Sequence, residues 1–194
     1  MVQVSRTAPG FVRKLFEAEV PEIKSGQVVI KGLVREPGYR TKMAVYSEDP
    51  NIDAVGACVG NRGLRVSSIV AELGGEKIEI IPWCEDVLEF IARALSPAKV
   101  IMVEANEEER NAKVIVKDDM LSLAIGKDGQ NARLAARLTN WKIDVRPYSA
   151  YMKQKEEEEA AEAAAAAEEE AQPEEAPSAE PEDTAEVGEE VTSD

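Results

Sequence analysis

The stretch AIGKDGQNARLAARL, residues 124–138, places two glycines three residues apart at the start of a helical pattern. Gly126 and Gly129 enclose the charged pair Lys127 and Asp128. Glycine allows a tight turn between two helices and lets another backbone come close. The helix that follows presents unpaired N–H groups and a partial positive charge at its N-terminus. The stretch therefore predicts a helix–loop–helix seat for a phosphodiester backbone.

A second copy of this pattern, VGNRGLRVSSIVAEL, stands 66 positions earlier at residues 59–73. Gly60 then matches Gly126, and Gly63 matches Gly129. After a one-residue gap, KIEI in the first copy matches KIDV in the second. Matching segments at a fixed spacing indicate an internal repeat of roughly 65 residues.

Each repeat is predicted to run helix–strand–strand–helix–loop–helix–strand, from apolar residues at helical or alternating spacing. In the first repeat, Pro37 and Gly38 form the turn between two strands, with glycine taking the positive φ of a type II turn. The predicted fold class is α+β, with two three-stranded sheets that each carry helices on one face. Trp83 and Trp141 flank the third strands, a place that favours core or domain-docking roles over stacking with a ligand. We expect the two repeats to dock rigidly across the junction at 83–86.

The acidity of the chain is confined to its C-terminal end. Residues 156–194 hold 17 of the 38 Asp and Glu residues and neither Lys nor Arg, whereas the first 155 residues carry all 23 basic groups. Attraction to a polyanion must therefore come from local basic patches. The Ala/Glu/Pro-rich composition predicts a tail that is helical at its start and then disordered.

The composition argues against several kinds of site. The chain has no histidine, and its two cysteines, Cys58 and Cys84, are far apart. Zinc sites built on cysteine and histidine and Ser-His or Cys-His nucleophile pairs are therefore excluded. We predict small core residues at both cysteines, no cofactor, no metal and no enzymatic activity. No apolar run approaches the roughly 20 residues of a membrane span.

The loops do not match other phosphate-binding motifs. A Walker loop needs GxxxxGK[ST], and a dinucleotide site needs GxGxxG directly after a strand. Both loops here follow a helical segment instead. A GXXG loop between two helices is typical of the single-stranded RNA mode that clamps about four nucleotides.

Several side chains around the loops leave two roles open. Asp128 either borders the anion or caps and charges the helix N-terminus, which is the favoured role. Arg133 and Arg137 share a helix face that either lines the groove or is solvated. Gln130 and Asn131 either read base edges or bind phosphates. The candidate RNA-binding set is Gly60, Asn61, Arg62, Gly63, Arg65, Gly126, Lys127, Asp128, Gly129, Gln130, Asn131, Arg133 and Arg137.

Several long motifs resemble the tandem KH domains of the NusA family of bacterial transcription factors. The resemblance is carried by REPGYRTKMAV, DPNIDAVGACVGNRG, ELGGEKIEI, ALSPAKV and LAIGKDGQNARLAARLTNWKIDV, and it runs from about Ser5 to Tyr148. It implies the type II KH fold. It also implies that both loops face one strand of RNA.

The resemblance implies a non-enzymatic, RNA-binding elongation factor module in the bacterial cytoplasm. Such a module captures nascent single-stranded RNA and takes part in pausing, termination and antitermination, with RNA polymerase and other elongation factors as partners. A monomer without membrane contact is expected. A KH protein that binds ribosomal RNA or assists ribosome assembly is the alternative. A nucleotide-hydrolysing enzyme is disfavoured, because no Walker pair or metal-binding carboxylates accompany the loops.

The same resemblance sets the expected domain limits. Residues 1–14 resemble the end of an S1 domain, so the chain is either a fragment or a short form. The first KH domain is expected at 15–84, the second at 85–150, and the acidic tail at 151–194. Polymerase anchoring depends in the family on domains that precede this region.

Overall fold

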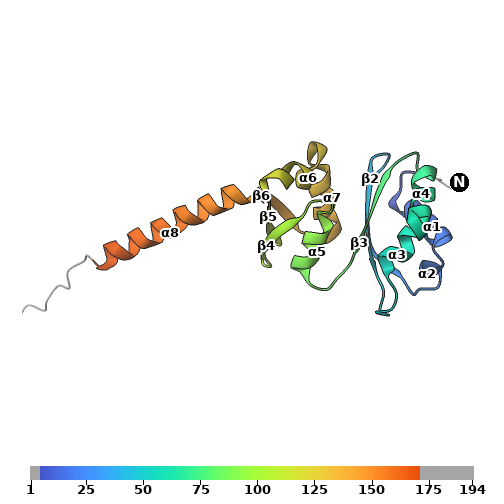
Figure 1. Cartoon of the computed structure of the whole chain (residues 1–194), viewed down its shortest axis with the longest axis horizontal. Coiled ribbons are helices and arrows are strands. Elements are labelled where there is room, and N and C mark those ends of the chain that lie inside the picture. Colours follow the sequence, from blue (N-terminus) through green and yellow to red (C-terminus); the bar gives the residue numbers. More distant parts are fainter. Residues whose placement is uncertain (1–4, 171–194) are drawn as a thin grey trace, which may run out of the picture. The chain divides into compact units, whose positions relative to one another are not determined.

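The structure is a computed structural model that describes residues 5–170, with side chains described for residues 5–161. It contains two three-stranded sheets with helices packed on them, so the predicted α+β class is confirmed (Figure 1). Both sheets lie in one compact unit that ends at Gln154, and a second unit begins at Lys155. The disorder predicted for the tail concerns residues 171–194, which lie outside the described residues.

The first repeat follows the predicted order of elements. It comprises α1 (Pro9–Glu19), α2 (Pro21–Lys24), β1 (Val29–Glu36), β2 (Arg40–Tyr46), α3 (Ala54–Val59), the 3-10 turn Asn61–Gly63, α4 (Leu64–Glu72) and β3 (Lys77–Pro82). The predicted N-terminal helix is divided at Val20, because Pro21 cannot donate the hydrogen bond that would continue α1. Gly38 has a φ of +79°, as the predicted turn requires.

The second repeat has the same plan. It comprises α5 (Val87–Ala94), β4 (Val100–Asn106), β5 (Asn111–Val116), the 3-10 turn Asp118–Met120, α6 (Leu121–Ile125), the 3-10 turn Lys127–Gly129, α7 (Gln130–Thr139) and β6 (Lys142–Pro147). A last helix, α8 (Tyr148–Glu170), begins directly after β6. The described part of the chain contains no helix long and apolar enough to cross a membrane.

Both sheets share one topology that fixes where the glycine loops lie. The central strand pairs antiparallel with the first strand and parallel with the third, in the order β1-β2-β3 and β4-β5-β6. A parallel pair cannot be joined by a tight hairpin and needs a crossover connection. In each repeat this crossover consists of two helices, and the glycine loop is the turn between them.

Each repeat has its own hydrophobic core. The first is built around Phe16 of α1, Met43 of β2 and Ile69 of α4, and it includes the fully buried Cys58. The second contains residues from α5, β5 and α7, and Trp141 packs against it. Cys58 is therefore a core residue as predicted, whereas Cys84 is only half-buried because it lies in the connection between the repeats.

The two repeats also contact each other through α7, which packs on the strands β1 and β2. A Cβ added at Gly32 would lie 3.0 Å from Leu138 Cδ1, so the helix comes close to the first sheet. Lys42 on β2 is fully buried and donates to Ser96 O at 2.9 Å and to Glu79 at 2.6 Å. Burial lowers the pKa of Lys42, while Glu79 opposes this shift.

Trp83 closes the same junction. Its ring lies edge-on to Tyr46 at 5.2 Å and to Phe90 of the second repeat at 6.5 Å, measured between ring centroids. Lys31 Nζ lies 4.6 Å from its centroid, within cation–π range. This is the docking role that the sequence favoured for Trp83.

Candidate nucleic-acid interface

The two glycine loops have nearly identical backbones. Gly60 and Gly126 both have φ 76° and ψ 173°. The third residue of each loop is left-handed, with φ 51° at Arg62 and 53° at Asp128, and the second glycines follow at 76° and 72°. Two loops that share only their glycines at equivalent positions thus adopt one conformation.

The first glycine of each loop is required for two reasons. Its φ and ψ fall in a region that is essentially restricted to glycine. A Cβ on Gly126 would also lie 2.8 Å from Asn131 Cβ, and one on Gly60 would lie 2.6 Å from Arg65 Cγ. The turn therefore depends on close contact with the helix that follows it.

Asn131 and Arg65 are equivalent residues that fasten the loops from behind. The Asn131 amide, fully buried, donates to Leu95 O and Ala124 O, both at 3.0 Å. Arg65 donates to Ala57 O at 2.6 Å and forms a salt bridge to Glu22 at 3.1 Å. The last carbonyls of a helix have no intrahelical partner. Both side chains thus donate to carbonyls near the end of the helix that precedes the loop. They hold the two helices of the crossover together.

The helices after the loops begin without a side-chain cap. The N-cap residues are Gly63 for α4 and Gly129 for α7, and neither helix receives a capping hydrogen bond from a side chain. Asp128 therefore does not cap α7 through a hydrogen bond, although its charge still lies beside the positive end of the helix dipole. Leu64 N and Gln130 N, the first amides of the two helices, donate to Asn61 O and Lys127 O, so it is the positive end of each helix dipole that attracts an anion here.

The cationic side chains of the loops are exposed. Asn61 and Arg62 lie on the first loop and Lys127 on the second. Among the described residues, neither Arg62 nor Lys127 forms a salt bridge. These charges can therefore approach a phosphate without first breaking an ion pair.

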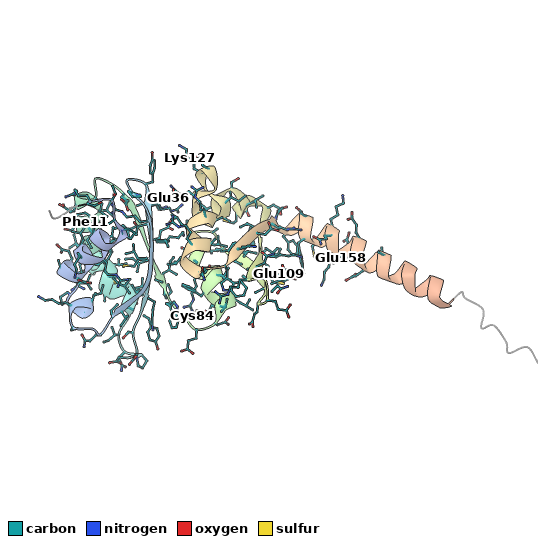
Figure 2. The ribbon with its side chains drawn as sticks, turned by 180° about the vertical axis from the view of Figure 1, so that it is seen from behind. Phe11, Glu36, Cys84, Glu109, Lys127 and Glu158 are labelled. Carbon is teal, nitrogen blue, oxygen red and sulfur yellow. The ribbon has the colours of Figure 1, made fainter. Side chains whose placement is uncertain are left out.

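Gln130 and Arg133 are instead held by a residue of the first repeat that the sequence did not reveal. Glu36, which is labelled in Figure 2, lies at the end of β1. It accepts from Gln130 Nε2 at 2.8 Å and from Arg133 Nε at 2.9 Å. The hydrogen bonds from Arg133 and Gln130 hold the pKa of Glu36 below its ordinary value. Glu36 thus orients the α7 side chains that stand next to the second loop.

A hollow of about 250 Å³ lies where the second loop meets the β1–β2 turn. Its lining includes Glu36, Lys127, Gln130 and Tyr39, whose side chain is 72% exposed. The hollow therefore combines an aromatic ring and an amide with two cations, Lys127 and Arg133, and two carboxylates, Glu36 and Asp128. Arg137 lies one helical turn after Arg133 on α7 and is exposed.

Apolar side chains beside both loops are exposed as well. Leu123 and Ile125 project from α6 just before Gly126, and Leu64 at the start of α4 is 68% exposed. Unstacked bases need an apolar surface next to a phosphate seat. Each loop thus has an exposed apolar side chain for a base beside a helix N-terminus for a phosphate.

Nothing in the described residues resembles a metal site, since they contain no group of three or more His, Cys, Asp or Glu side chains placed to hold an ion. Burial raises the pKa of the Cys58 thiol to about 12, which keeps it protonated and a poor nucleophile. The described side chains around the loops are cationic, amide and apolar groups, which are suited to binding a nucleic acid.

Comparison with known proteins identifies two adjoining domain families. Residues 6–83 match the NusA-like first KH domain, and residues 87–153 match the NusA-like second KH domain. Several curated relatives are called transcription termination/antitermination protein NusA. The relative from Halalkalibacterium halodurans is 57% identical over 148 residues, which cover 76% of this chain and 39% of that protein. The relative from Bacillus subtilis is 58% identical over 145 residues, with 75% and 39% covered.

A more distant relative, from Thermus thermophilus, is 50% identical over 140 residues, with 72% of this chain and 36% of that protein covered. The chain spans about two fifths of the length of the first relatives. The solved structure of APE1850 gives a TM-score of 0.53 at 19% identity and covers 71% of this chain and 97% of that one. That likeness concerns the fold alone.

Proposed function

The chain belongs to the NusA family through its paired KH domains, and we propose that it is the RNA-binding module of a bacterial transcription elongation factor. Its ligand is nascent single-stranded RNA, held at both glycine loops. By analogy with the named relatives, the module acts in termination and antitermination, and also in pausing. It works by binding, without catalysis.

One observation carries this proposal: two loops 66 residues apart have the same strained backbone, and each opens an uncapped helix. The left-handed conformation of a non-glycine residue, Arg62 in one loop and Asp128 in the other, costs of order 1–3 kcal/mol and persists where the structure or its function requires it. Two turns that only connected helices would not need the same unfavourable backbone conformation. A phosphate at each helix N-terminus accounts for both loops at once.

The residues around each loop then take distinct roles. Arg62 and Lys127 approach phosphates, whose oxygens lie at the positive N-terminal ends of α4 and α7. Leu123 and Ile125 contact bases. Arg65 and Asn131 position the loops and do not touch the RNA themselves.

We assign residues 15–84 to the first KH domain and 85–150 to the second. The helix α1 (Pro9–Glu19) crosses the first of these limits. Val12 and Phe16, which lie on either side of the limit, both belong to the first core. RNA polymerase and other elongation factors are the proposed protein partners, in the bacterial cytoplasm, and the module itself acts as a monomer.

Fluorescence anisotropy tests the proposal with a labelled, unstructured RNA of about a dozen nucleotides. The test variant carries Arg62→Asp and Lys127→Asp, and Asp128 shows that aspartate is accepted at the left-handed position that Arg62 occupies. The control carries Lys113→Glu and Lys117→Glu, which change the net charge equally at exposed lysines outside the loops.

Binding by the unmodified chain and by the control, lost in the loop variant, is the expected result. Each phosphate contact to single-stranded RNA contributes about −0.7 to the slope of log K against log salt, so the loop variant should also flatten this slope by about 1.4. Equal loss in both variants would mean that only net charge matters. That result would contradict the assignment of RNA to the loops.

A further inference from the structure

A second basic surface lies beyond the glycine loops, at the far end of α7. It surrounds a hollow of about 450 Å³ whose lining includes Arg110, Arg133, Arg137, Trp141 and Lys142. All four cationic residues are exposed, and Trp141 is half-buried. We call this set the α7 basic surface. Glu109, labelled in Figure 2, is the one acidic residue that lines the same hollow.

The backbone brings these side chains together from three separate elements. Asn140, with φ 60° and ψ 36°, ends α7 in the left-handed conformation and turns the chain into β6. Lys142 N donates to Arg110 O at 2.9 Å, which sets the start of β6 beside the β4–β5 turn. Arg137 comes from the last turn of α7. The fold therefore brings these cationic residues close together from separate parts of the sequence.

Most of this charge is not neutralised inside the molecule. Among the residues that the structure describes, Arg110, Arg137 and Lys142 form no salt bridge. Arg133 is paired with Glu36, and the charge of Arg137 also helps to lower the pKa of Glu36. Three exposed cations within one hollow, opposed by a single carboxylate, leave a net positive site for an anion.

The internal repeat shows that the fold itself does not require the arginines of this surface. The first-repeat residues that correspond to Arg133 and Arg137 are Ser67 and Ala71. The residue that corresponds to Trp141 is Glu76, which is fully buried. The glycine loop recurs in both repeats and Lys142 corresponds to Lys77, but the three arginines of the surface belong to the second repeat alone.

Arg133 connects this surface to the second loop. It lines both the 250 Å³ hollow that contains Lys127 and the 450 Å³ hollow that contains Lys142. The helix between the two hollows has 10 residues and is therefore about 15 Å long. A strand of several nucleotides can span this distance, and its negatively charged phosphates complement the positive surface.

We propose that the α7 basic surface is a further single-stranded RNA site, which binds the phosphates of nucleotides that continue past the second glycine loop. Arg110, Arg137 and Lys142 bind phosphate oxygens. The exposed part of Trp141 offers a face on which a base can stack. The inference rests on the proposed function, because the strand must first be held at the second loop.

The test compares two RNA lengths on the 194-residue chain. A short RNA of about six nucleotides is sufficient for one loop, since such a loop clamps about four nucleotides. A long RNA of about sixteen nucleotides reaches the α7 basic surface as well. The test variant is Arg137→Gln with Lys142→Gln, and the control is Lys113→Gln with Lys117→Gln, which removes the same charge from exposed lysines elsewhere.

The double variant should bind the long RNA about 10- to 25-fold more weakly near 0.1 M salt, because each lost phosphate contact lowers affinity by about 5-fold at that concentration. It should bind the short RNA like the control. In a Trp83→Phe background, Trp141 is the one remaining tryptophan of the chain, and the long RNA should quench its fluorescence more than the short RNA does.

Two failures can be told apart. If neither RNA binds the unmodified chain, the proposed function fails and the inference fails with it. If both RNAs bind but the double variant matches the control on the long RNA, the surface does not hold RNA. That second result would overturn the inference and leave the two glycine loops as the RNA site.

Discussion

Replacing Gly126 by alanine should destabilise the protein far more than replacing Gly129, although both glycines belong to one loop. At Gly126 the new Cβ would lie 2.8 Å from Asn131 Cβ and 2.9 Å from Asn131 N, and φ is +76°. At Gly129 φ is +72°, but nothing lies within 4 Å of the new Cβ. The pair therefore separates backbone strain from steric overlap.

The magnitudes follow from these geometries. A left-handed alanine costs about 1–2 kcal/mol, which is the whole expected effect at Gly129. At Gly126 a glycine-only backbone region costs about 1–3 kcal/mol. Overlap with the fixed start of α7 adds about 1–3 kcal/mol, because the Asn131 N atom belongs to the backbone and cannot swing aside. We expect Gly126→Ala to lower the free energy of unfolding by about 2–6 kcal/mol in total.

Urea denaturation followed by circular dichroism measures both values under the same conditions. Gly10→Ala serves as a control, since Gly10 lies in α1 with nothing within 4 Å of a Cβ and should change stability little. Equal losses for Gly126→Ala and Gly129→Ala would refute the reasoning. That outcome would mean that α7 does not approach the loop as closely as the structure shows.

Three further predictions concern buried or paired groups. Glu76→Ala should cost about 3–5 kcal/mol of unfolding free energy in urea denaturation, because it strips a fully buried arginine–glutamate pair of its anion; a cost below about 1 kcal/mol would argue against the burial. Glu36 has a lowered pKa, so its bond to Arg133 should persist above the ordinary value of 4.5 and be lost as the pH falls through the lowered pKa. An NMR titration of the Glu36 carboxyl that gave a midpoint at or above 4.5 would contradict this. In the native protein Cys84 should react with a thiol reagent and Cys58 should not until the chain unfolds, since burial raises the pKa of Cys58 to about 12; equal native rates, followed by absorbance, would disprove it.

The fold could be predicted because its signals are local and occur twice. Periodicity within each segment predicted the helices and strands, and the repeat supplied a second copy of every element. The resemblance of long motifs to the NusA family was confirmed by both domain matches. The end of α1 was not predicted, although Pro21 follows it, because the apolar spacing continues through Val20.

The details of the site depend on contacts between distant residues, which a sequence pattern does not encode. Asn131 looks like a loop-side polar residue, yet its amide is fully buried against carbonyls of the preceding segments. Glu36 stands 94 residues before its partner Gln130, and nothing in its own surroundings suggests that contact. The left-handed φ of Arg62 had no local signal either, since arginine is not a residue that favours this conformation.

The central claim is that RNA phosphates occupy the N-termini of both α4 and α7. Backbone amide NMR of the ¹⁵N-labelled chain, titrated with an unstructured RNA of about sixteen nucleotides, tests it most directly. Large shifts are expected for the amides of residues 61–66 and 127–132 together, with small changes at α2. RNA that binds while either group of amides stays unmoved would contradict the claim that both loops hold the strand.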